Sequence, residues 1–311
     1  MNMRLAIREQ VRKQILPSVA LSLLAACGVQ EYHADTPSQY LSAAGCAQVN
    51  RDNLAAAAGY ANAYLTVATG DPAFPPWGEG GTTDEHREWT LNDPYLGRGF
   101  EGAVTFEVAK RLDFSKDRVR FVPIGFDESF APGPKRFDFV LQQISYLPER
   151  IEAVDFSEGY YDVNQALVSV QSSPIATATS LEELKDATLG APVGTTSLTY
   201  IEDTIQPSTQ PTVYDDLSAA VRGLKKGHVD GIVVDLPSAS FITAEQIPEG
   251  VIVGRLPSAG SQEYFAMAFE KQSPLVECVN LALQEMKADG TLDEIRQEWL
   301  ADTADGPVIA G

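Results

Sequence analysis

Basic residues are scarce in this sequence relative to acidic ones. It has 23 Lys and Arg against 43 Asp and Glu, which gives a formal net charge of −20 at pH 7. Nucleic-acid binding depends on contacts between Lys or Arg and phosphates, so this balance argues against a nucleic-acid partner. It also disfavours electrostatic adhesion to anionic lipid. The excess of carboxylates is typical of a solubilising surface.

Histidine is rare as well. His33, His86 and His228 are the only three, and they are widely separated. A histidine-based metal centre needs several such side chains close together, so we expect no metal site. The sequence also contains no recognisable nucleophile–base pair, and we expect no cofactor.

Only one hydrophobic run approaches the length of a membrane span, and it lies near the start. Four basic residues precede the apolar run 15–26, which Pro17 interrupts. The run is too short to cross a bilayer, so residues 1–26 are predicted to be a cleaved export signal. The sequence Leu-Ala-Ala-Cys-Gly at 24–28 resembles a bacterial lipobox, in which Cys27 is lipidated. The alternative is an ordinary signal with an incidental cysteine. The lipobox predicts a protein anchored by lipid to the extracytoplasmic face of the bacterial cell membrane.

Cysteine is limited to three residues, and two of them remain after Cys27. In an oxidising compartment the pair Cys46 and Cys278 allows a disulfide, although spacing alone does not prove one. Two separate buried thiols are the alternative. A bond between them would join the N-terminal segment to the C-terminal part of the chain.

The remainder of the chain alternates short apolar runs with helical periods, which indicates an α/β fold. Strands are predicted at 65–69, 138–144, 166–170, 188–193 and 231–234. Helices are predicted at 101–112, after a capping box of Ser180 and Glu183, after Asp215 or Asp216, at 274–287 and at 291–300. Residues 78–97 form a polar insertion between the first strand and the first helix. It is most simply a surface loop, with a lid or partner-contact role left open.

Polar and aromatic side chains gather where the predicted strands end. Ligands of open parallel sheets bind outside the carboxyl ends of the strands. The residues found there are, in chain order, Asp71, Phe74, Trp77, Gln143, Ser145, Arg150, Gly194, Thr195, Thr196 and Asp235. One cation, one anion, hydroxyl groups and aromatic rings together suit a zwitterion.

The chemistry of such a ligand assigns a role to each charged group. Arg150 offers a bidentate contact to a carboxylate. Donors at Gly194–Thr196 add to it, because a helix N-terminus attracts anions. Asp235, with the Ser145 hydroxyl, offers acceptors to an ammonium group.

Each of these residues also has an ordinary structural explanation. Arg150 pairs equally well with Glu149 or Glu152 at the surface. Asp235 suits the cap of a turn before Pro237. The threonines suit helix caps, and the aromatic residues suit a core. The binding-site interpretation depends on the fact that these residues occur together, at the ends of four predicted strands.

The ordered motifs resemble a known family. They are DPAFPPW, GFEGAVTFEVAKRL, FDFVLQQISYLPERIEAVDFSEGYY, LGAPVGTTSLTYIED, HVDGIVVDLPSA and MKADGTLDEIRQEWL. In this order, over residues 62–301, they are similar to the family 3 extracellular solute-binding proteins, which serve ABC importers of polar amino acids.

The resemblance implies a type II periplasmic-binding-protein fold, with two α/β lobes joined by two crossover strands. Lobe 1 is expected at 62–160 and 256–301, and lobe 2 at 161–255. Residues 27–61 are then the lipidated cysteine with its tether, and 302–311 a C-terminal tail.

The resemblance also implies site roles. Arg150 binds the ligand carboxylate, with Ser145 and the motif Gly194-Thr195-Thr196 beside it, and Asp235 binds the amino group. Phe74, Trp77 and Phe126 line the side-chain pocket, which Asp71 reaches. Two departures are Leu147, where the family usually has Thr, and the long 78–97 insertion.

The sequence therefore predicts a monomeric receptor that delivers an amino acid or a similar small zwitterion to an ABC transporter permease by hinge closure, and not an enzyme. Two alternatives stay open. One is an enzyme on the same scaffold, like the cyclohexadienyl dehydratases, for which Glu101 and Asp127 are the nearest acid or base candidates. The other is a ligand sensor for a membrane partner.

Overall fold

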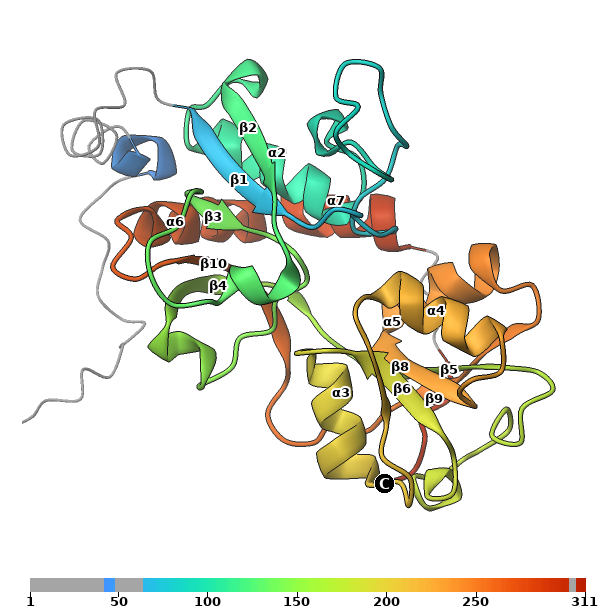
Figure 1. The fold of residues 1–311 in the computed structure, drawn as a ribbon. Helices are drawn as coiled ribbons and strands as arrows, with labels where there is room; N and C mark the ends of the chain where they lie inside the picture. Colours follow the sequence, from blue (N-terminus) through green and yellow to red (C-terminus); the bar gives the residue numbers. More distant parts are fainter. Residues whose placement is uncertain (1–41, 48–63, 302–305) are drawn as a thin grey trace, which may run out of the picture. The chain divides into compact units, whose positions relative to one another are not determined.

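The computed structural model of this chain contains two five-stranded β-sheets (Figure 1). The structure describes residues 42–47, 64–301 and 306–311. The predicted export signal and Cys27 lie outside these residues. No helix within the described ranges has the length and apolar character needed to cross a membrane.

The first sheet has the strand order β2-β1-β3-β10-β4. Its strands are β1 (Leu65–Thr69), β2 (Val119–Pro123), β3 (Phe139–Val140), β4 (Val154–Asp162) and β10 (Tyr264–Glu270). Strand β1 runs parallel to both β2 and β3, whereas β10 is antiparallel to β3 and β4. The carboxyl ends of β1, β2 and β3 therefore lie at one edge of the sheet.

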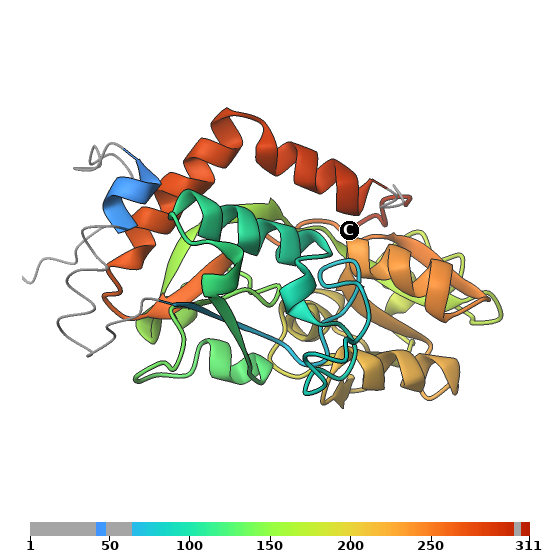
Figure 2. The ribbon, with the colours of Figure 1, turned by 90° about the horizontal axis from the view of Figure 1, so that it is seen from above.

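Three helices pack together beside the first sheet (Figures 1 and 2). They are α2 (Phe100–Arg111), α6 (Leu275–Ala288) and α7 (Thr291–Leu300). The predicted apolar face of the first helix is confirmed, because Val104, Val108 and Leu112 have no exposed area. Together with the sheet these helices enclose the largest hydrophobic core of the described chain.

The second sheet has the order β7-β6-β8-β5-β9. Its strands are β5 (Gln165–Val170), β6 (Leu189–Pro192), β7 (Thr212–Tyr214), β8 (Gly231–Asp235) and β9 (Gly250–Arg255). The wholly apolar run predicted as a strand covered on both faces is the central β8, and Ile232 and Val233 are fully buried. Its helices are α3 (Thr196–Tyr200), extended by a π-helical turn at Ile201–Ile205, α4 (Leu217–Lys225), and α5 (Leu236–Phe241), extended by a second such turn at Ile242–Gln246.

Short 3₁₀ turns connect these elements. They lie at Pro94–Leu96, Lys116–Arg118, Phe126–Ser129, Arg150–Glu152 and Glu182–Leu184. Where the capping box predicts a helix, the structure forms only the short 3₁₀ turn Glu182–Leu184. Glu183 does accept hydrogen bonds from the Ser180 and Thr179 side chains.

The chain passes between the two sheets where β4 leads into β5 and where β9 leads into β10. The first passage is short, because only Val163 and Asn164 separate the two strands. The two sheets are therefore connected here by very little backbone.

The strand predicted at 138–144 is wrong beyond its first residues, since only Phe139 and Val140 are in a strand. Asp138 precedes it and accepts a hydrogen bond from the backbone N–H of Thr66, at 2.7 Å. Gln143 has a φ of +50°, a left-handed conformation that no strand contains. The backbone thus turns away from the sheet immediately before Ser145.

A disulfide joins Cys46 to Cys278 on α6, with 5.3 Å between the two Cα atoms. Residues 43–47 form a helical turn whose Ala43, Cys46 and Ala47 are fully buried against the first sheet's core. The backbone N–H of Ala43 donates to Glu285 on α6, at 3.1 Å. The bond thus fixes an N-terminal segment to a helix 232 residues away in sequence.

We predict that reducing this disulfide lowers the free energy of unfolding by about 2–5 kcal/mol, because the cross-link restricts the unfolded chain. Thermal unfolding with and without a reductant measures the effect. The variant carrying both Cys46→Ser and Cys278→Ser is the control, since the reductant should not alter its unfolding temperature. An unchanged unfolding temperature for the wild-type chain under reductant contradicts the prediction.

The C-terminal residues 306–311 pair with the second sheet's region, although α7 before them packs beside the first sheet. The N–H of Arg255 donates to Pro307 and the N–H of Ile309 donates back to Arg255, at 2.7 and 2.9 Å. Ile309 is 1% exposed within the second sheet's core. The segment that the sequence marks only as a tail is therefore part of the packed structure.

Replacing Ile309 with Ala should lower the free energy of unfolding by about 2–5 kcal/mol, because it leaves a cavity in that core. The neighbouring Val308 is 61% exposed and provides a matched control. Val308→Ala should change stability by no more than about 0.5 kcal/mol. Chemical denaturation of both variants gives the comparison, and equal losses would show that the C-terminal segment is not docked.

Candidate functional site

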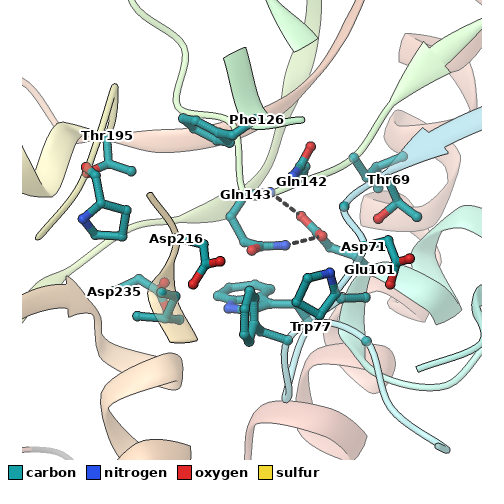
Figure 3. Close-up of a pocket in the computed structure, with 18 of the residues that line it drawn as sticks. Thr69, Asp71, Trp77, Glu101, Phe126, Gln142, Gln143, Thr195, Asp216 and Asp235 are labelled. Carbon is teal, nitrogen blue, oxygen red and sulfur yellow. Dashed lines mark hydrogen bonds between the residues drawn. The ribbon is translucent and has the colours of Figure 1, made fainter. Parts of the chain in front are cut away.

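A cavity of about 430 Å³ opens between residues of the two sheets (Figure 3). Its walls come from the segment after β1, the segments after β2 and β3, the start of α3, the turn before α4 and the end of β8. The volume lies within the range of roughly 300–1,000 Å³ that is usual for small-molecule sites. The carboxyl ends of the strands thus converge as the sequence predicts.

Asp235 ends β8 and is the N-cap of α5. It accepts hydrogen bonds from the backbone N–H and the hydroxyl of Ser238, at 2.8 and 2.9 Å. Burial raises the pKa of Asp235 to about 6, against the lowering effect of the Ser238 bonds. The structure therefore combines the two sequence interpretations, since Asp235 both caps a helix and lines the cavity.

Trp77 connects the segment after β1 to Asp235. Its indole N–H donates to the Ser238 hydroxyl, at 2.9 Å, and Ser238 in turn donates to Asp235. The indole is 1% exposed and meets Phe100, Tyr161 and Phe265 edge to face. It is thus a core residue of the first sheet that also forms a wall of the cavity.

Arg150 lies behind Ser145 rather than on the cavity surface. Its guanidinium donates to the carbonyls of Ser145 and Gly194, at 2.8 and 2.9 Å. The rings of Phe130 and Phe126 lie 4.3 and 5.6 Å from its central carbon. Burial lowers the pKa of Arg150 to about 10, so it remains a cation at neutral pH.

The start of α3 presents hydroxyl groups to the same region. Gly194 has a φ of +71°, and a Cβ there would lie 2.8 Å from an Asp127 carboxylate oxygen, so the turn requires glycine. Thr195 caps the helix by accepting from the N–H of Leu198. The Thr196 hydroxyl lies 3.5 Å from that of Ser145.

Two polar residues that sequence reasoning missed complete this region. Glu263 accepts from the Ser145 hydroxyl at 2.5 Å and from the Gln165 amide at 3.2 Å. Gln165 also contacts Thr196 and Ser197. Both residues lie where the chain passes between the sheets, and this position is the only signal by which the sequence points to them.

Glu101, at the start of α2, is buried at the cavity wall. It accepts from the backbone N–H of Gln143 at 2.8 Å, from the Gln143 side-chain amide and from the Tyr160 hydroxyl (Figure 3). Burial raises the pKa of Glu101 from 4.5 to about 7, and these three bonds oppose the rise. The left-handed turn at Gln143 is what brings both of its donors to this carboxyl group.

Residues of the insertion 78–97 form part of the cavity wall. Glu79, Asn92 and Asp93 line the cavity. Thr90 donates its backbone N–H to Asp71 at 2.9 Å and its hydroxyl to the same oxygen. The insertion therefore helps to fix the position of Asp71, one of the predicted site residues.

Most of the residues predicted for the site are brought together. Lining the cavity are Asp71, Phe74, Trp77, Phe126, Gln143, Ser145, Thr195, Thr196 and Asp235. Arg150 and Gly194 are bonded to each other beside it. Gln142 and Asp216 also line it and were not predicted, because neither ends a predicted strand.

Stability should fall as the pH rises from about 4.5 to 7, because the folded chain holds the Glu101 proton more tightly than the unfolded chain does. The shift corresponds to a loss on the order of 3 kcal/mol. Glu101→Gln should remove that part of the pH dependence, whereas Glu88→Gln, at an exposed position, should retain it. Denaturation across this pH range measures both, and parallel curves for Glu101→Gln and wild type would contradict the assignment.

Comparisons with known proteins agree on one family. The sequence model of the bacterial extracellular solute-binding proteins, family 3, matches residues 88–302. The arginine-binding extracellular protein ArtP of Bacillus subtilis is 30% identical over 53% of this chain, and the match spans 64% of that protein, less than two thirds of its length. The L-cystine-binding protein TcyJ of Escherichia coli K12 is 27% identical over 65% of this chain and 73% of its own.

Solved structures give the same fold. An ancestral arginine-binding protein bound to glutamine has a TM-score of 0.61 at 30% identity and covers 76% of this chain and 98% of its own. The solute receptor for L-cysteine of Neisseria gonorrhoeae has a TM-score of 0.62 at 25% identity, over 78% and 91% of the two chains. The predicted fold class, two α/β lobes of the type II periplasmic-binding-protein kind, is confirmed.

Proposed function

This chain belongs to the bacterial extracellular solute-binding proteins, family 3, and we propose that it captures an amino acid or a similar small zwitterion and delivers it to an ABC importer. Relatives named for arginine, L-cystine and glutamine binding support the ligand class. The observation that carries the proposal is that one cavity has the carboxyl group of Asp235 in its wall and the guanidinium of Arg150 beside it, bonded to the carbonyls of Ser145 and Gly194.

These two groups match the two charges of an α-amino acid. Asp235 offers acceptors to the ammonium group. Arg150 carries two Nη groups, each already donating to one carbonyl, and further N–H donors for a carboxylate. Ser145, Thr195 and Thr196 add hydroxyl groups to the same cavity wall. Burying a charged group costs free energy unless an opposite charge pairs with it. A zwitterion that pairs with both groups therefore offsets the free energy that closing the cavity would otherwise cost.

We propose that delivery uses hinge closure about the two passages between the sheets. Lobe 1 then comprises 62–160 and 256–301, and lobe 2 comprises 161–255. A solute shifts such an equilibrium only by binding one state better than the other. A solute that touches both lobes gains contacts in the closed state that it lacks in the open one. The Arg150–Gly194 and Trp77–Ser238 hydrogen bonds show where the two lobes already meet beside the cavity.

The export signal at 1–26 and the lipobox cysteine belong to the same proposal. Cys27 carries the lipid that holds the protein at the outer face of the cell membrane, with 27–61 as its tether. We propose that the protein acts as a monomer. Mass spectrometry of the membrane fraction tests for the lipid on Cys27. An N-terminus without lipid would contradict this part of the proposal.

Calorimetry of the purified protein against the proteinogenic amino acids tests the binding function. A micromolar solute corresponds to roughly −8 kcal/mol. We expect Arg150→Ala and Asp235→Asn each to weaken binding by at least about 100-fold, roughly 3 kcal/mol, because each leaves an opposite charge without its partner.

Arg118→Ala is the matched control, because Arg118 is exposed just before β2, whose other end leads to the cavity, and does not itself line the cavity. It should bind as the wild type does. Circular dichroism and thermal unfolding establish that each variant is folded. Normal binding by folded Arg150→Ala would show that the site assignment is wrong.

One observation favours an enzyme as the second candidate, namely the pKa of Glu101, raised to about 7 at the cavity wall. A general acid or base works best with such a value. Glu101, however, already accepts three hydrogen bonds, which suits a fixed structural carboxyl group. We propose that the chain is not an enzyme, and recovery of the bound solute unchanged after prolonged incubation distinguishes the two functions.

A further inference from the structure

Glu263 and Gln165 lie at the two passages between the sheets and contact hydroxyl groups of the cavity wall. Gln165 begins β5, directly after the first passage, and Glu263 ends the second passage, directly before β10. Backbone bonds join the two passages. The N–H of Val163 donates to the carbonyl of Glu263 at 2.8 Å, and the N–H of Leu256 donates to that of Gln165 at 2.8 Å. Both side chains are therefore held in place independently of any solute.

Glu263 determines where the proton of the Ser145 hydroxyl points. The neighbouring residues are paired through the backbone, since the N–H of Tyr146 donates to the carbonyl of Tyr264 at 3.1 Å. The Ser145 oxygen lies 2.5 Å from Oε1 of Glu263. A carboxylate only accepts hydrogen bonds and a hydroxyl group has one proton, so Ser145 donates that proton to Glu263. Only the lone pairs of the Ser145 oxygen are left for a solute, which meets Ser145 as an acceptor.

Gln165 gives the Thr196 hydroxyl the opposite polarity. Gln165 is 8% exposed, and its Nε2 lies 3.2 Å from Oγ1 of Thr196 and 3.2 Å from Oε2 of Glu263. The carboxylate requires a donor, so the amide nitrogen faces Glu263 and the amide oxygen accepts from Ser197 at 2.8 Å. The same nitrogen therefore donates to the Thr196 oxygen. The Thr196 proton stays available, and a solute meets Thr196 as a donor.

The two hydroxyl groups are neighbours in the cavity wall. Their oxygens are 3.5 Å apart, and both residues line the cavity. The ammonium and carboxylate groups of an α-amino acid are attached to the same carbon atom, so two adjacent hydroxyl groups suit one of them each. Gln165 is also paired with Asp235 in the register of β5 and β8, and the proposed function assigns Asp235 to the ammonium group.

From this arrangement we infer that Glu263 and Gln165 are positioning residues, which make Ser145 an acceptor for the solute's ammonium group and Thr196 a donor for its carboxylate. The inference rests on the proposed function. A hydroxyl group that rotates freely suits either charge, whereas these two are set before the solute arrives, and binding does not have to reorient them. A carboxylate placed against the Ser145 lone pairs loses hydrogen bonds to water and gains none.

Two substitutions that leave the charge unchanged test the polarity of the hydroxyl groups. The probes are an amino acid that binds in calorimetry, the amine that lacks its carboxylate and the acid that lacks its ammonium group. For L-arginine these two analogues are agmatine and deamino-arginine. Ser145→Ala should weaken binding of the amine about 10-fold and of the deamino acid less than about two-fold. Thr196→Val should show the reverse.

Each result of this comparison decides the inference. The opposite pairing, or equal losses of both analogues in each variant, overturns it and leaves the proposed function standing. Failure of every proteinogenic amino acid to bind the wild-type protein overturns the proposed function as well. Circular dichroism and thermal unfolding establish that each variant is folded.

Double variants test whether Glu263 acts through Ser145. Glu263→Ala frees the Ser145 proton, so it should weaken binding of the amine about 10-fold and leave the deamino acid bound at least as tightly. Loss of a negative charge alone has the same sign. On the Ser145→Ala background, however, Glu263→Ala should change amine binding less than about two-fold, because the intermediary is already absent. An undiminished loss on that background contradicts the positioning role.

The corresponding cycle tests Gln165. Gln165→Leu should weaken binding of the deamino acid about three-fold, because the Thr196 hydroxyl is then free to rotate. This loss should disappear on the Thr196→Val background, and its persistence there contradicts the role of Gln165.

Glu249→Ala is the matched control for Glu263→Ala. Glu249 is exposed directly before β9 and does not line the cavity. Its replacement removes the same charge and should leave the affinities for all three probes unchanged. A loss of amine binding equal to that in Glu263→Ala would assign the effect to net charge and overturn the inference. If Glu263→Ala does not fold, the comparison of Ser145→Ala with Thr196→Val decides alone.

Discussion

The buried guanidinium of Arg150 is the interaction on which the arrangement of the cavity depends. A cation away from water is costly unless its donors are occupied. Arg150 meets this requirement with one carbonyl on each side, those of Ser145 and Gly194, and with the faces of two phenylalanines. The turn after β3 and the turn before α3 therefore have to lie close together. Those same turns present Ser145, Thr195 and Thr196 to the cavity.

A second contact across the cavity complements the first. Trp77 donates to Ser238, whose hydroxyl donates to Asp235. One crossing contact thus involves a cation and the other leads to an anion, each backed by aromatic rings of the first sheet. The proposed zwitterion offers an opposite charge to each of these groups. The proposed capture of an amino acid follows from this polarity more than from any single residue.

Local sequence signals account for much of the fold and of the site. Apolar runs and caps locate β1, β8, α4 and α7, because each depends on residues within a few positions of one another. The strand predicted at 138–144 fails because the Glu101 carboxyl group, 42 residues earlier, binds both donors of Gln143 in a left-handed turn. The docking of Ile309 and the contact of Thr90 with Asp71 are equally non-local. No periodicity or spacing in the sequence encodes such contacts.

The acidity of the whole chain and that of the cavity have different origins. An excess of carboxylates over the chain is explained by a solubilising surface. The cavity differs from such a surface, because its carboxyl groups come from five or more separate segments of the chain and line one concave wall. Closure brings these carboxyl groups closer together, so their mutual repulsion opposes the closed state until a solute pairs with some of them.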